Sequence, residues 1–292
     1  MVIKRVFLPL LLATIAILTL CTSAFAAEEN VSKSTLRVAV FADHFAKLKQ
    51  VYESKGCVST DQFNVGENQM LAEFLLFCNA LESSGEYQIQ LVPFPVIDRV
   101  LDALKESEVD AIAFGIWASD AERYGFDMSQ PLLESGQFTK GLYTRADLAQ
   151  KYQGIPVAEL QELIIVANQN WKEDWKALTC SGMSLLHVNR YEQMFRLVEK
   201  GRADFLPLTF SAKQDLERKV FNISLYPLKG IKIQFSQSLH FVVNPLQATA
   251  KALQDALNQG LKRQRRSGQI QRVYERLGLT NHKVTNWLAI GC

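Results

Sequence analysis

Arg123 is the residue whose type and position most clearly suggest binding chemistry. It lies between two apolar runs. The first of them, residues 109–116, comes directly after a segment with the pattern of an amphipathic helix and is itself too short for a free-standing helix. That run predicts a buried strand ending at a cleft, where the ligands of open α/β sheets bind. A guanidinium in such a place presents a planar, permanently charged fork that fits a carboxylate. The alternative is a solvated arginine on a surface loop, because loops carry both kinds of residue.

The sequence offers little for catalysis or metal binding. Its four histidines, His44, His187, His240 and His282, lack the spacing of metal ligands, and none neighbours a serine or cysteine nucleophile in sequence. Ser184 lacks the second glycine of a nucleophile elbow. We therefore expect no metal, no cofactor and no catalytic group.

Strand-like and helix-like patterns alternate in the first half of the chain. Residues 36–41 and 87–92 alternate apolar and polar side chains, whereas residues 64–81 and 96–105 have helical periodicity. Together with the strand at 109–116 they give a β-α-β rhythm, which predicts a parallel sheet covered by helices on both faces.

The second half predicts another α/β unit and then a return to the first. Its apolar runs and periodic segments come in the order strand 163–167, helix 171–178, strand 183–188, helix 190–200 and strand 205–210. The chain leaves the first unit through the apolar residues 137–144, returns near 233–243 and continues into helices at 248–265 and 270–277. Two crossings make the joint between the units a natural hinge.

The centre of the chain carries a recognisable series of residues. An acidic residue precedes a short apolar strand, an arginine closes a polar turn, and an aromatic residue and a proline follow, here Asp110, residues 111–115, Arg123, Phe126 and Pro131. Weaker patterns flank it in a fixed order: a first strand at 36–40, a helix at 96–104, the G-x-x-D at 201–204, and closing helices that include Tyr274 and Gly278. The whole series resembles the bacterial extracellular solute-binding proteins of family 3, which serve polar amino-acid uptake.

The resemblance implies an α/β fold of the two-lobed type II periplasmic binding protein kind, with two mixed sheets flanked by helices and joined by a two-crossover hinge. Residues 1–26 would be a signal peptide. Residues 34–140 together with 236–292 would form lobe 1, and residues 141–235 would form lobe 2. A small molecule would bind between the lobes.

The same resemblance assigns ligand contacts in lobe 1. Arg123 would hold the ligand's carboxylate, and Phe94, next to two prolines, would form an aromatic wall. The stretch from Asp110 to Arg123 is one residue longer than the family's pattern, so the register of Trp117 and Ser119 against a ligand is open. Trp117 is either a stacking wall or a core residue.

In lobe 2, Asn189 and Arg190 open a predicted helix, with Asn189 as its N-cap, and a helix start favours an anion. Where the family's amino-acid binders usually carry an aspartate for the ligand's ammonium, this sequence has Thr209. A buried ammonium without a carboxylate is costly, which argues against an ordinary α-amino-acid pose. Asp43, which with Phe45 follows the first strand, is a candidate replacement.

The N-terminus indicates export. Lys4 and Arg5 precede an uncharged run, and small residues at 24–26 fit a signal-peptidase site. An uncleaved membrane anchor is the alternative, because the run is long enough to span a bilayer. Cleavage would remove two of the 32 basic residues and none of the 30 acidic ones, leaving a formally neutral chain with nothing that indicates nucleic-acid binding. We expect a periplasmic protein.

Cysteine usage fits an oxidising compartment. Once Cys21 leaves with the signal, Cys57, Cys78, Cys180 and Cys292 remain, and three pairings are open. We favour Cys57 with Cys78, since one lies in a loop of the first lobe and the other on the helix that follows, which leaves Cys180 with Cys292. The second bond would tie the C-terminal segment to the other lobe. A metal site is the alternative, but no C-x-x-C is present.

The expected function is binding of a small, carboxylate-bearing solute, an amino acid or a related organic acid. Contacts divided between Arg123 and the helix start at Asn189 would be complete only when the cleft is shut, so the ligand would favour the closed form. A monomer would then present it to an ABC permease or a membrane sensor. Two alternatives remain: a dehydratase-like enzyme on the same scaffold with Asp120 or Glu122 as general acid, and a degenerate scaffold that acts through protein contacts.

Overall fold

The computed structural model of the 292-residue chain describes residues 33–66, 68–82 and 84–292, so the predicted signal peptide lies outside the described residues. The first series of elements is β1 (Ser34–Phe41), α1 (Ala42–Lys55), α2 (Gln69–Glu82), β2 (Tyr87–Phe94), α3 (Ile97–Lys105), β3 (Ala111–Trp117), α4 (Ala118–Tyr124) and β4 (Asp127–Met128). The second is β5 (Thr139–Thr144), α5 (Ala146–Lys151), α6 (Val157–Leu160), β6 (Ile164–Ala167), α7 (Lys172–Cys180), β7 (Ser184–His187), α8 (Tyr191–Glu199), β8 (Leu206–Leu208), β9 (Arg218–Val220) and β10 (Ile223–Gln234). The chain continues through β11 (Leu239–Val243), α9 (Ala250–Arg266), α10 (Gln269–Leu277), the 3-10 helix η1 (His282–Val284) and β12 (Leu288–Ile290).

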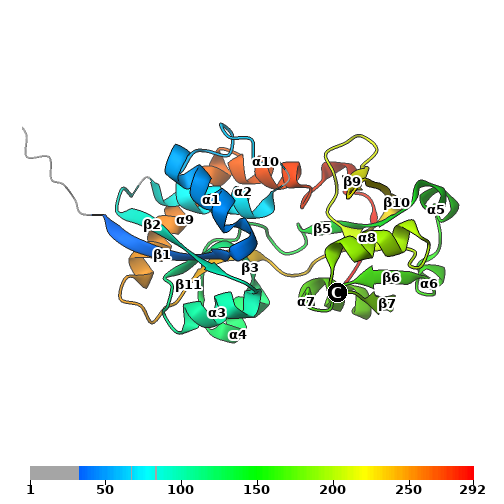
Figure 1. Cartoon of the computed structure of the whole chain (residues 1–292), viewed down its shortest axis with the longest axis horizontal. Helices are drawn as coiled ribbons and strands as arrows, with labels where there is room; N and C mark the ends of the chain where they lie inside the picture. Colours follow the sequence, from blue (N-terminus) through cyan, green and yellow to red (C-terminus); the bar gives the residue numbers. More distant parts are fainter. Residues whose placement is uncertain (1–32, 67, 83) are drawn as a thin grey trace, which may run out of the picture. The chain divides into compact units, whose positions relative to one another are not determined.

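The first sheet has the strand order β2-β1-β3-β11-β4. β1 runs parallel to β2 and β3, whereas β11 runs antiparallel to β3 and β4, so the sheet is mixed. Helices α1 and α2 cover one face and α3 and α4 the other (Figure 1). The β-α-β rhythm of the sequence produces this arrangement, because parallel neighbours need a helical crossover between them.

Strand β3 lies between two hydrophobic layers, which explains its uninterrupted apolar sequence. Ala111 and Ala113 belong to the cluster that contains α2, while Ile112, Phe114 and Ile116 belong to the cluster that contains α3. Successive side chains of a strand point to opposite faces, so a strand covered on both faces is apolar throughout. This double burial fixes the end of β3 firmly beside the start of α4.

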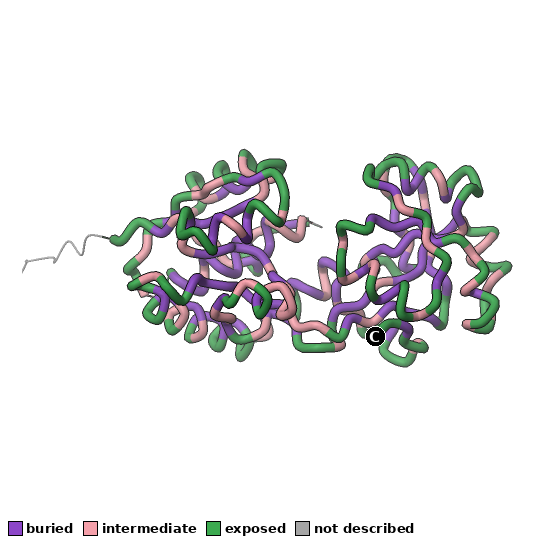
Figure 2. Tube along the Cα trace, turned by 90° about the horizontal axis from the view of Figure 1, so that it is seen from below, coloured by how far each residue is buried: buried purple, intermediate pink, exposed green. Residues whose placement is uncertain are grey.

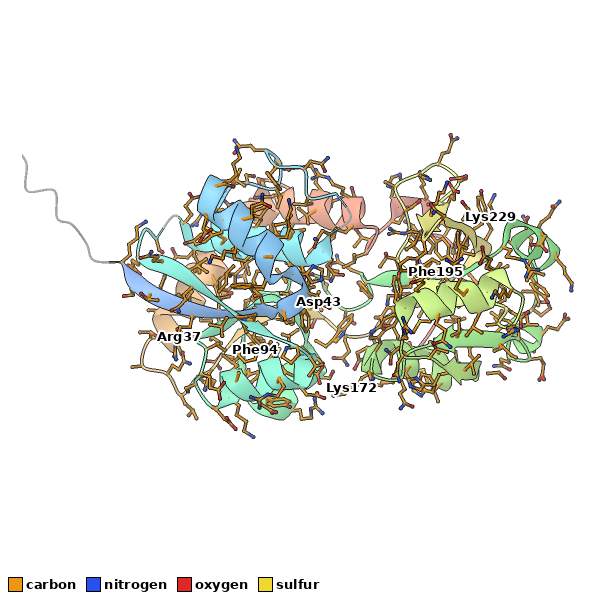
Figure 3. The ribbon with its side chains drawn as sticks, in the orientation of Figure 1. Arg37, Asp43, Phe94, Lys172, Phe195 and Lys229 are labelled. Carbon is orange, nitrogen blue, oxygen red and sulfur yellow. A yellow bond between two sulfur atoms is a disulfide. The ribbon has the colours of Figure 1, made fainter. Side chains whose placement is uncertain are left out.

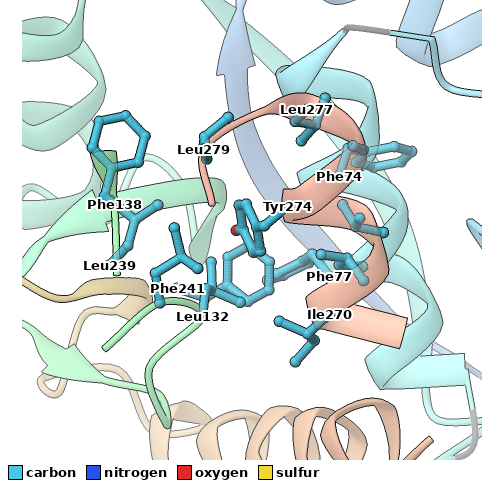
Figure 4. Close-up of a cluster of buried hydrophobic side chains, with 14 of the residues drawn as sticks. Phe74, Phe77, Leu132, Phe138, Leu239, Phe241, Ile270, Tyr274, Leu277 and Leu279 are labelled. Atoms are coloured by element: carbon cyan, nitrogen blue, oxygen red, sulfur yellow. The ribbon is translucent and has the colours of Figure 1, made fainter. Parts of the chain in front are cut away.

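Three helices of the first unit pack tightly against one another. A side chain at Gly260 on α9 would place its Cβ 2.2 Å from the carbonyl oxygen of Ala80 on α2, so only glycine allows this approach. Tyr274 on α10 is fully buried, and its ring lies among Phe77, Phe241 and Leu132 (Figure 4). These contacts bring the C-terminal helices onto the layer formed by α2.

The second main sheet has the order β12-β10-β5-β8, with β9 paired to β10, and β6 and β7 form a separate parallel pair. β5 and β10 run antiparallel, and β12 joins β10 in parallel. The buried stretches of the chain follow the central strands, while turns and outer helix faces are exposed (Figure 2). The predicted α/β architecture of two mixed sheets flanked by helices is confirmed.

The chain enters this second sheet at the start of β5 and leaves it at the end of β10, as the apolar run 137–144 and the return near 233–243 predicted. β12 makes a third connection, because it follows α10 in the chain and pairs with β10. The lobe boundaries themselves remain a prediction.

Three departures from the sequence expectation lie in the first series of elements. α1 occupies residues for which no helix was predicted, and the polar turn before Arg123 is the short helix α4. β2 continues through Pro93, whose missing N–H costs no ladder bond because β2 is an edge strand.

Both predicted disulfides are present, Cys57–Cys78 and Cys180–Cys292. The second joins α7 to the segment after β12. In the described part of the chain, no helix combines the length and apolarity needed to cross a bilayer.

Candidate functional site

A group of polar and aromatic residues gathers where β5 and β10 meet the end of β3. We call it the crossing cluster; it consists of Trp117, Ser119, Phe138, Lys140, Trp171, Glu173, Asp174, Phe235 and Gln237. Its members come from β3, α4, the two connecting segments and the start of α7. The cluster therefore joins elements of both sheets.

Aromatic rings form one side of the cluster. The Trp117 ring stacks on Phe235, with centroids 5.7 Å apart, and meets Phe138 edge to face at 5.3 Å. Trp117 is half-buried and packs against the larger hydrophobic cluster. The ring therefore contributes to the core, which is one of its two expected roles, and its role as a stacking wall for a ligand stays a prediction.

A partly buried ion pair lies beside these rings. Lys140 Nζ is 2.5 Å from Asp174 Oδ1, and the two side chains are 14% and 9% exposed. The same ammonium is 5.5 Å from the Trp171 ring centroid and 5.8 Å from that of Phe235. Carboxylate and aromatic faces together stabilise a cation in this position.

Ser119 bonds to the other acidic residue of the cluster. Its hydroxyl donates to Glu173 Oε1 at 3.1 Å, and its backbone N–H donates to Gln237 Oε1 at 3.1 Å. Lys172, one residue before Glu173, pairs with Asp98 at 3.3 Å. The hydroxyl and the backbone N–H of Ser119, at the start of α4, are thus already bonded to a carboxylate oxygen and an amide oxygen.

Arg123 lies in the last turn of α4 and makes contacts within its own helix. Its Nη2 donates to Asp120 Oδ1 at 2.6 Å, and its guanidinium lies 5.1 Å from the centroid of the Tyr124 ring. The side chain is 51% exposed. Among the described contacts, none joins Arg123 to the crossing cluster, and its role as the partner of a ligand's carboxylate stays a prediction.

The other residues of the first unit that we predicted to contact the ligand lie on α1 and at the end of β2. Asp43 is exposed in the first turn of α1, and Phe45 packs partly buried on the main hydrophobic cluster. Phe94, at the end of β2, is only 8% exposed and lies in the same cluster as Val100 and Leu101. Figure 3 labels Asp43 and Phe94 on these elements. The Phe94 ring is a core residue in this conformation.

Thr209 is engaged by a neighbouring arginine. Arg218 Nη2 donates to the Thr209 hydroxyl at 2.7 Å, and Arg218 Nε donates to the Thr209 carbonyl at 2.8 Å. The Arg218 residue is buried. The hydroxyl and carbonyl of Thr209 therefore already accept hydrogen bonds from a cation, and the position does not supply the carboxylate that a ligand's ammonium group needs.

The predicted helix start at Asn189 is displaced by one residue. α8 begins at Tyr191 with Arg190 as N-cap, and no side chain caps it. The Asn189 carbonyl accepts from Asn168 Nδ2 at 3.3 Å. Both Asn189 and Arg190 are exposed, and Arg190 borders a shallow hollow of about 260 Å³ with Glu192.

Sequence reasoning missed Lys140, Glu173, Asp174 and Gln237. The sequence does carry a signal for Lys140, because it is the only charged residue in the apolar run 137–144 that was predicted to cross between the lobes. A lone ammonium in such a run needs a buried partner. The partner, 34 residues away, is not visible in the sequence. Within the described residues, no group of three metal-ligating side chains occurs.

Comparison with known proteins identifies the fold. No protein-family model and no curated protein matches the sequence. The structure is similar to ytmK of Bacillus subtilis, a probable amino-acid ABC transporter extracellular-binding protein, with a TM-score of 0.57, 13% identity, and coverage of 84% of this chain and 97% of that chain. It is also similar to AncCDT-1, an ancestral cationic amino acid solute binding protein, with a TM-score of 0.54, 18% identity, and coverage of 84% and 95%.

A third similar structure is the amino acid ABC transporter substrate-binding protein AbpA of Streptococcus pneumoniae, bound to L-arginine, with a TM-score of 0.53, 15% identity, and coverage of 85% and 96%. Its chain and the two above are matched over nearly their whole length. The two-lobed type II periplasmic binding protein fold predicted from the sequence is confirmed.

Proposed function

We propose that this protein is a periplasmic solute-binding protein that closes over a small carboxylate-bearing molecule, an amino acid or a related organic acid. The observation that carries the proposal is the crossing cluster, in which residues of both sheets meet at the connecting strands β5 and β10. A ligand that contacts both sides favours the closed state by its differential affinity. An ABC permease or a membrane sensor would read that state.

The candidate contacts divide by charge. Arg123 would bind the carboxylate group of the ligand. That group would replace Asp120, whose Oδ1 now accepts a hydrogen bond from Arg123 at 2.6 Å. Glu173 is the partner of an ammonium, because it supplies the carboxylate that is absent at Thr209 and lies on the polar side of the cluster. Trp117 and Ser119, whose hydroxyl bonds to Glu173, would contact the same ligand. Asp43 and Phe45, at the start of α1, would complete the first side, and Asn189 and Arg190 the second.

The test is a thermal-shift screen of residues 27–292 against amino acids, dicarboxylates and polyamines, followed by calorimetry. A ligand that binds only the native state raises the melting temperature with the logarithm of its concentration. We expect a hit among the anionic or zwitterionic compounds. Arg123→Ala should weaken its binding by about tenfold or more, the loss expected for a charged hydrogen bond.

Three further variants sharpen the result. Arg272→Ala is the matched control, because Arg272 is also half-exposed and its Nη2 is paired with one carboxylate, that of Asp61. Asp120→Asn should tighten binding, since it removes the competing carboxylate. Glu173→Gln should weaken amino acids but spare dicarboxylates. A hit that survives Arg123→Ala unchanged would exclude the arginine as the carboxylate's partner.

The enzyme alternative gains no support from its proposed acids. Asp120 is held by Arg123, and Glu122 is exposed on α4. A solved structure similar to this one is described as an amino acid-binding precursor of cyclohexadienyl dehydratase, and that activity belongs to a descendant of that protein. Recovery of the bound compound unchanged after prolonged incubation is the expected result, whereas a product would establish an enzyme.

A further inference from the structure

A cavity of about 780 Å³ lies on the opposite face of β5 and β10 from the Lys140 pair. In the register of these strands Thr139 faces Gln234, Lys140 faces Ile233 and Gly141 faces Lys232. Paired residues share a face and neighbours alternate, so Thr139, Gln234 and Lys232 lie on one face and Lys140 lies on the other. All three residues of the first set line the cavity.

The C-terminal segment closes the other side. The lining there includes Tyr274 on α10, Thr280, His282 on η1 and Trp287 before β12. The segment is fixed in place by backbone bonds, among them Thr139 N–H to the Leu279 carbonyl at 2.9 Å. The cavity is therefore a formed feature of the fold and belongs to a different face from the crossing cluster.

Lys232 gives the cavity a buried positive charge. The residue is 8% exposed, and its Nζ donates to the carbonyl oxygens of Val284, at 3.0 Å, and Thr285, at 2.9 Å. An ammonium has three hydrogens, so these bonds leave one donor. In the described residues no carboxylate pairs with Lys232, although buried lysines are rare without such a partner.

Two hydroxyl groups of the lining also lack partners. Thr139 is 6% exposed, and neither its Oγ1 nor that of Thr280 has a hydrogen-bond partner among the described residues. A buried hydroxyl without a partner costs free energy, so each is a donor that a bound acceptor would satisfy. Of the described charged side chains in the lining, Lys232 and Arg265 oppose one acid, Glu275.

We propose that this cavity is a second binding site, specific for a small oxyanion that carries a carboxylate or phosphate group. One of its oxygens accepts the third hydrogen of Lys232, and further oxygens accept from the hydroxyls of Thr139 and Thr280. The charge of the anion balances the buried ammonium. The site is separate from the proposed solute site, because none of its donors belongs to the crossing cluster.

The test titrates inorganic phosphate, sulfate and citrate into residues 27–292 at constant ionic strength, with chloride as the reference ion, and follows both heat and melting temperature. A response to phosphate or sulfate indicates a site for inorganic oxyanions, whereas a response to citrate alone indicates a site for carboxylates. Specific binding saturates, whereas the general stabilisation by excluded salts rises without saturation. We expect a saturable response to at least one of the three anions.

The variants locate that response. Lys232→Met should weaken the anion by about tenfold or more, because a charged hydrogen bond is lost. Lys229→Met is the matched control, since Lys229 lies exposed on the same strand (Figure 3) and should leave the response intact. Arg123→Ala should also leave it intact, because that side chain belongs to the other proposed site.

Thr139→Val keeps the proposal testable if Lys232→Met does not fold. Without anion this variant should unfold at the same temperature as the parent or higher, because an unpartnered hydroxyl is removed, and with anion it should bind several-fold more weakly. The proposal is overturned if no anion gives a saturable response, if Lys232→Met or Thr139→Val binds as the parent does, or if Arg123→Ala abolishes binding.

Discussion

Glu73 is a fully buried carboxyl group that links three elements. It accepts hydrogen bonds from the backbone N–H of Gly115 at 2.9 Å, from Gln69 Nε2 at 3.0 Å and from the hydroxyl of Tyr274 at 3.1 Å. Burial raises the pKa of Glu73, and the three hydrogen bonds offset part of that rise. Burial and the nearby carboxyl raise the pKa of Tyr274 well above its usual value.

A raised native pKa makes stability depend on pH in a defined direction. Because folded Glu73 holds its proton to higher pH than unfolded Glu73, its contribution is fully present below the ordinary value of 4.5 and is lost as pH rises through the native value. Glu73→Gln mimics the protonated form and should flatten this part of the curve. Urea unfolding at several pH values between about 4.5 and 8 measures it.

The control for this experiment is Glu82→Gln, an exposed residue of the same helix. Its stability curve should run parallel to that of the parent. If the Glu73→Gln curve is also parallel, the carboxyl group does not titrate in this window, and the pH dependence has another source.

At the scale of single residues, the sequence indicated which side chains lie near the end of the buried strand, but not which residues they bond to. The motif located Arg123, Trp117 and Ser119 near the end of a buried strand, where the structure has them. It could not show that Ser119 bonds to Glu173, 54 residues away, because side-chain pairs between elements depend on how those elements pack. Arg123 illustrates the same limit, since its bond to Asp120 follows from α4 being a helix.

At the scale of the elements, the close contact between α2 and α9 depends on one glycine, Gly260. Gly260 brings the α9 backbone against Ala80, and a Cβ there would lie 2.2 Å from the Ala80 oxygen and 2.4 Å from its Cα. Both obstructing atoms belong to backbone, so relief requires the helices to separate. Close packing does not allow that without loss of contacts.

Gly260→Ala should therefore destabilise the protein, by about 2 kcal/mol, although alanine is the better helix former by about 1 kcal/mol. The unfolding free energy in urea measures this change. Lys262→Ala, at an exposed position of the same helix, should alter stability by less than about 0.5 kcal/mol. Stabilisation by Gly260→Ala would show that propensity outweighs the close approach.

Periodicity predicted the long elements and failed for the short or weakly patterned ones. The helices α3, α8, α9 and α10 were found because their buried residues recur on one face. α1 was missed because only Leu48 and Val51 of its fourteen residues are buried, so it carries almost no apolar stripe. α4, with seven residues, is shorter than the window in which a helical period can be recognised.

Two covalent links act on the molecule as a whole, and they close loops of different size. Cys57 and Cys78 are 21 residues apart, whereas Cys180 and Cys292 are 112 apart. In the chain-entropy description, a link stabilises the fold by restricting the unfolded chain, by about 3 kcal/mol for the shorter loop and about 5 kcal/mol for the longer one.

Replacing Cys180 and Cys292 together by alanine should therefore lower the unfolding free energy more than replacing Cys57 and Cys78. Urea unfolding of the two double variants, without reductant, gives the comparison. An equal or reversed order would mean that native packing around the bonds, and not the size of the closed loop, determines their effect.

The antiparallel pair of β5 and β10 has a cation on each side, the partly buried Lys140 toward Asp174 and the buried Lys232 toward the C-terminal segment. β5 and β10 are the central strands of one sheet, so a displacement imposed from either side moves peptide units that both sides share. Thermodynamic reciprocity then requires that, if an anion behind the ribbon changes the solute's dissociation constant by some factor, the solute changes the anion's constant by the same factor. Binding at the proposed solute site would in this way respond to the anions of the surrounding fluid.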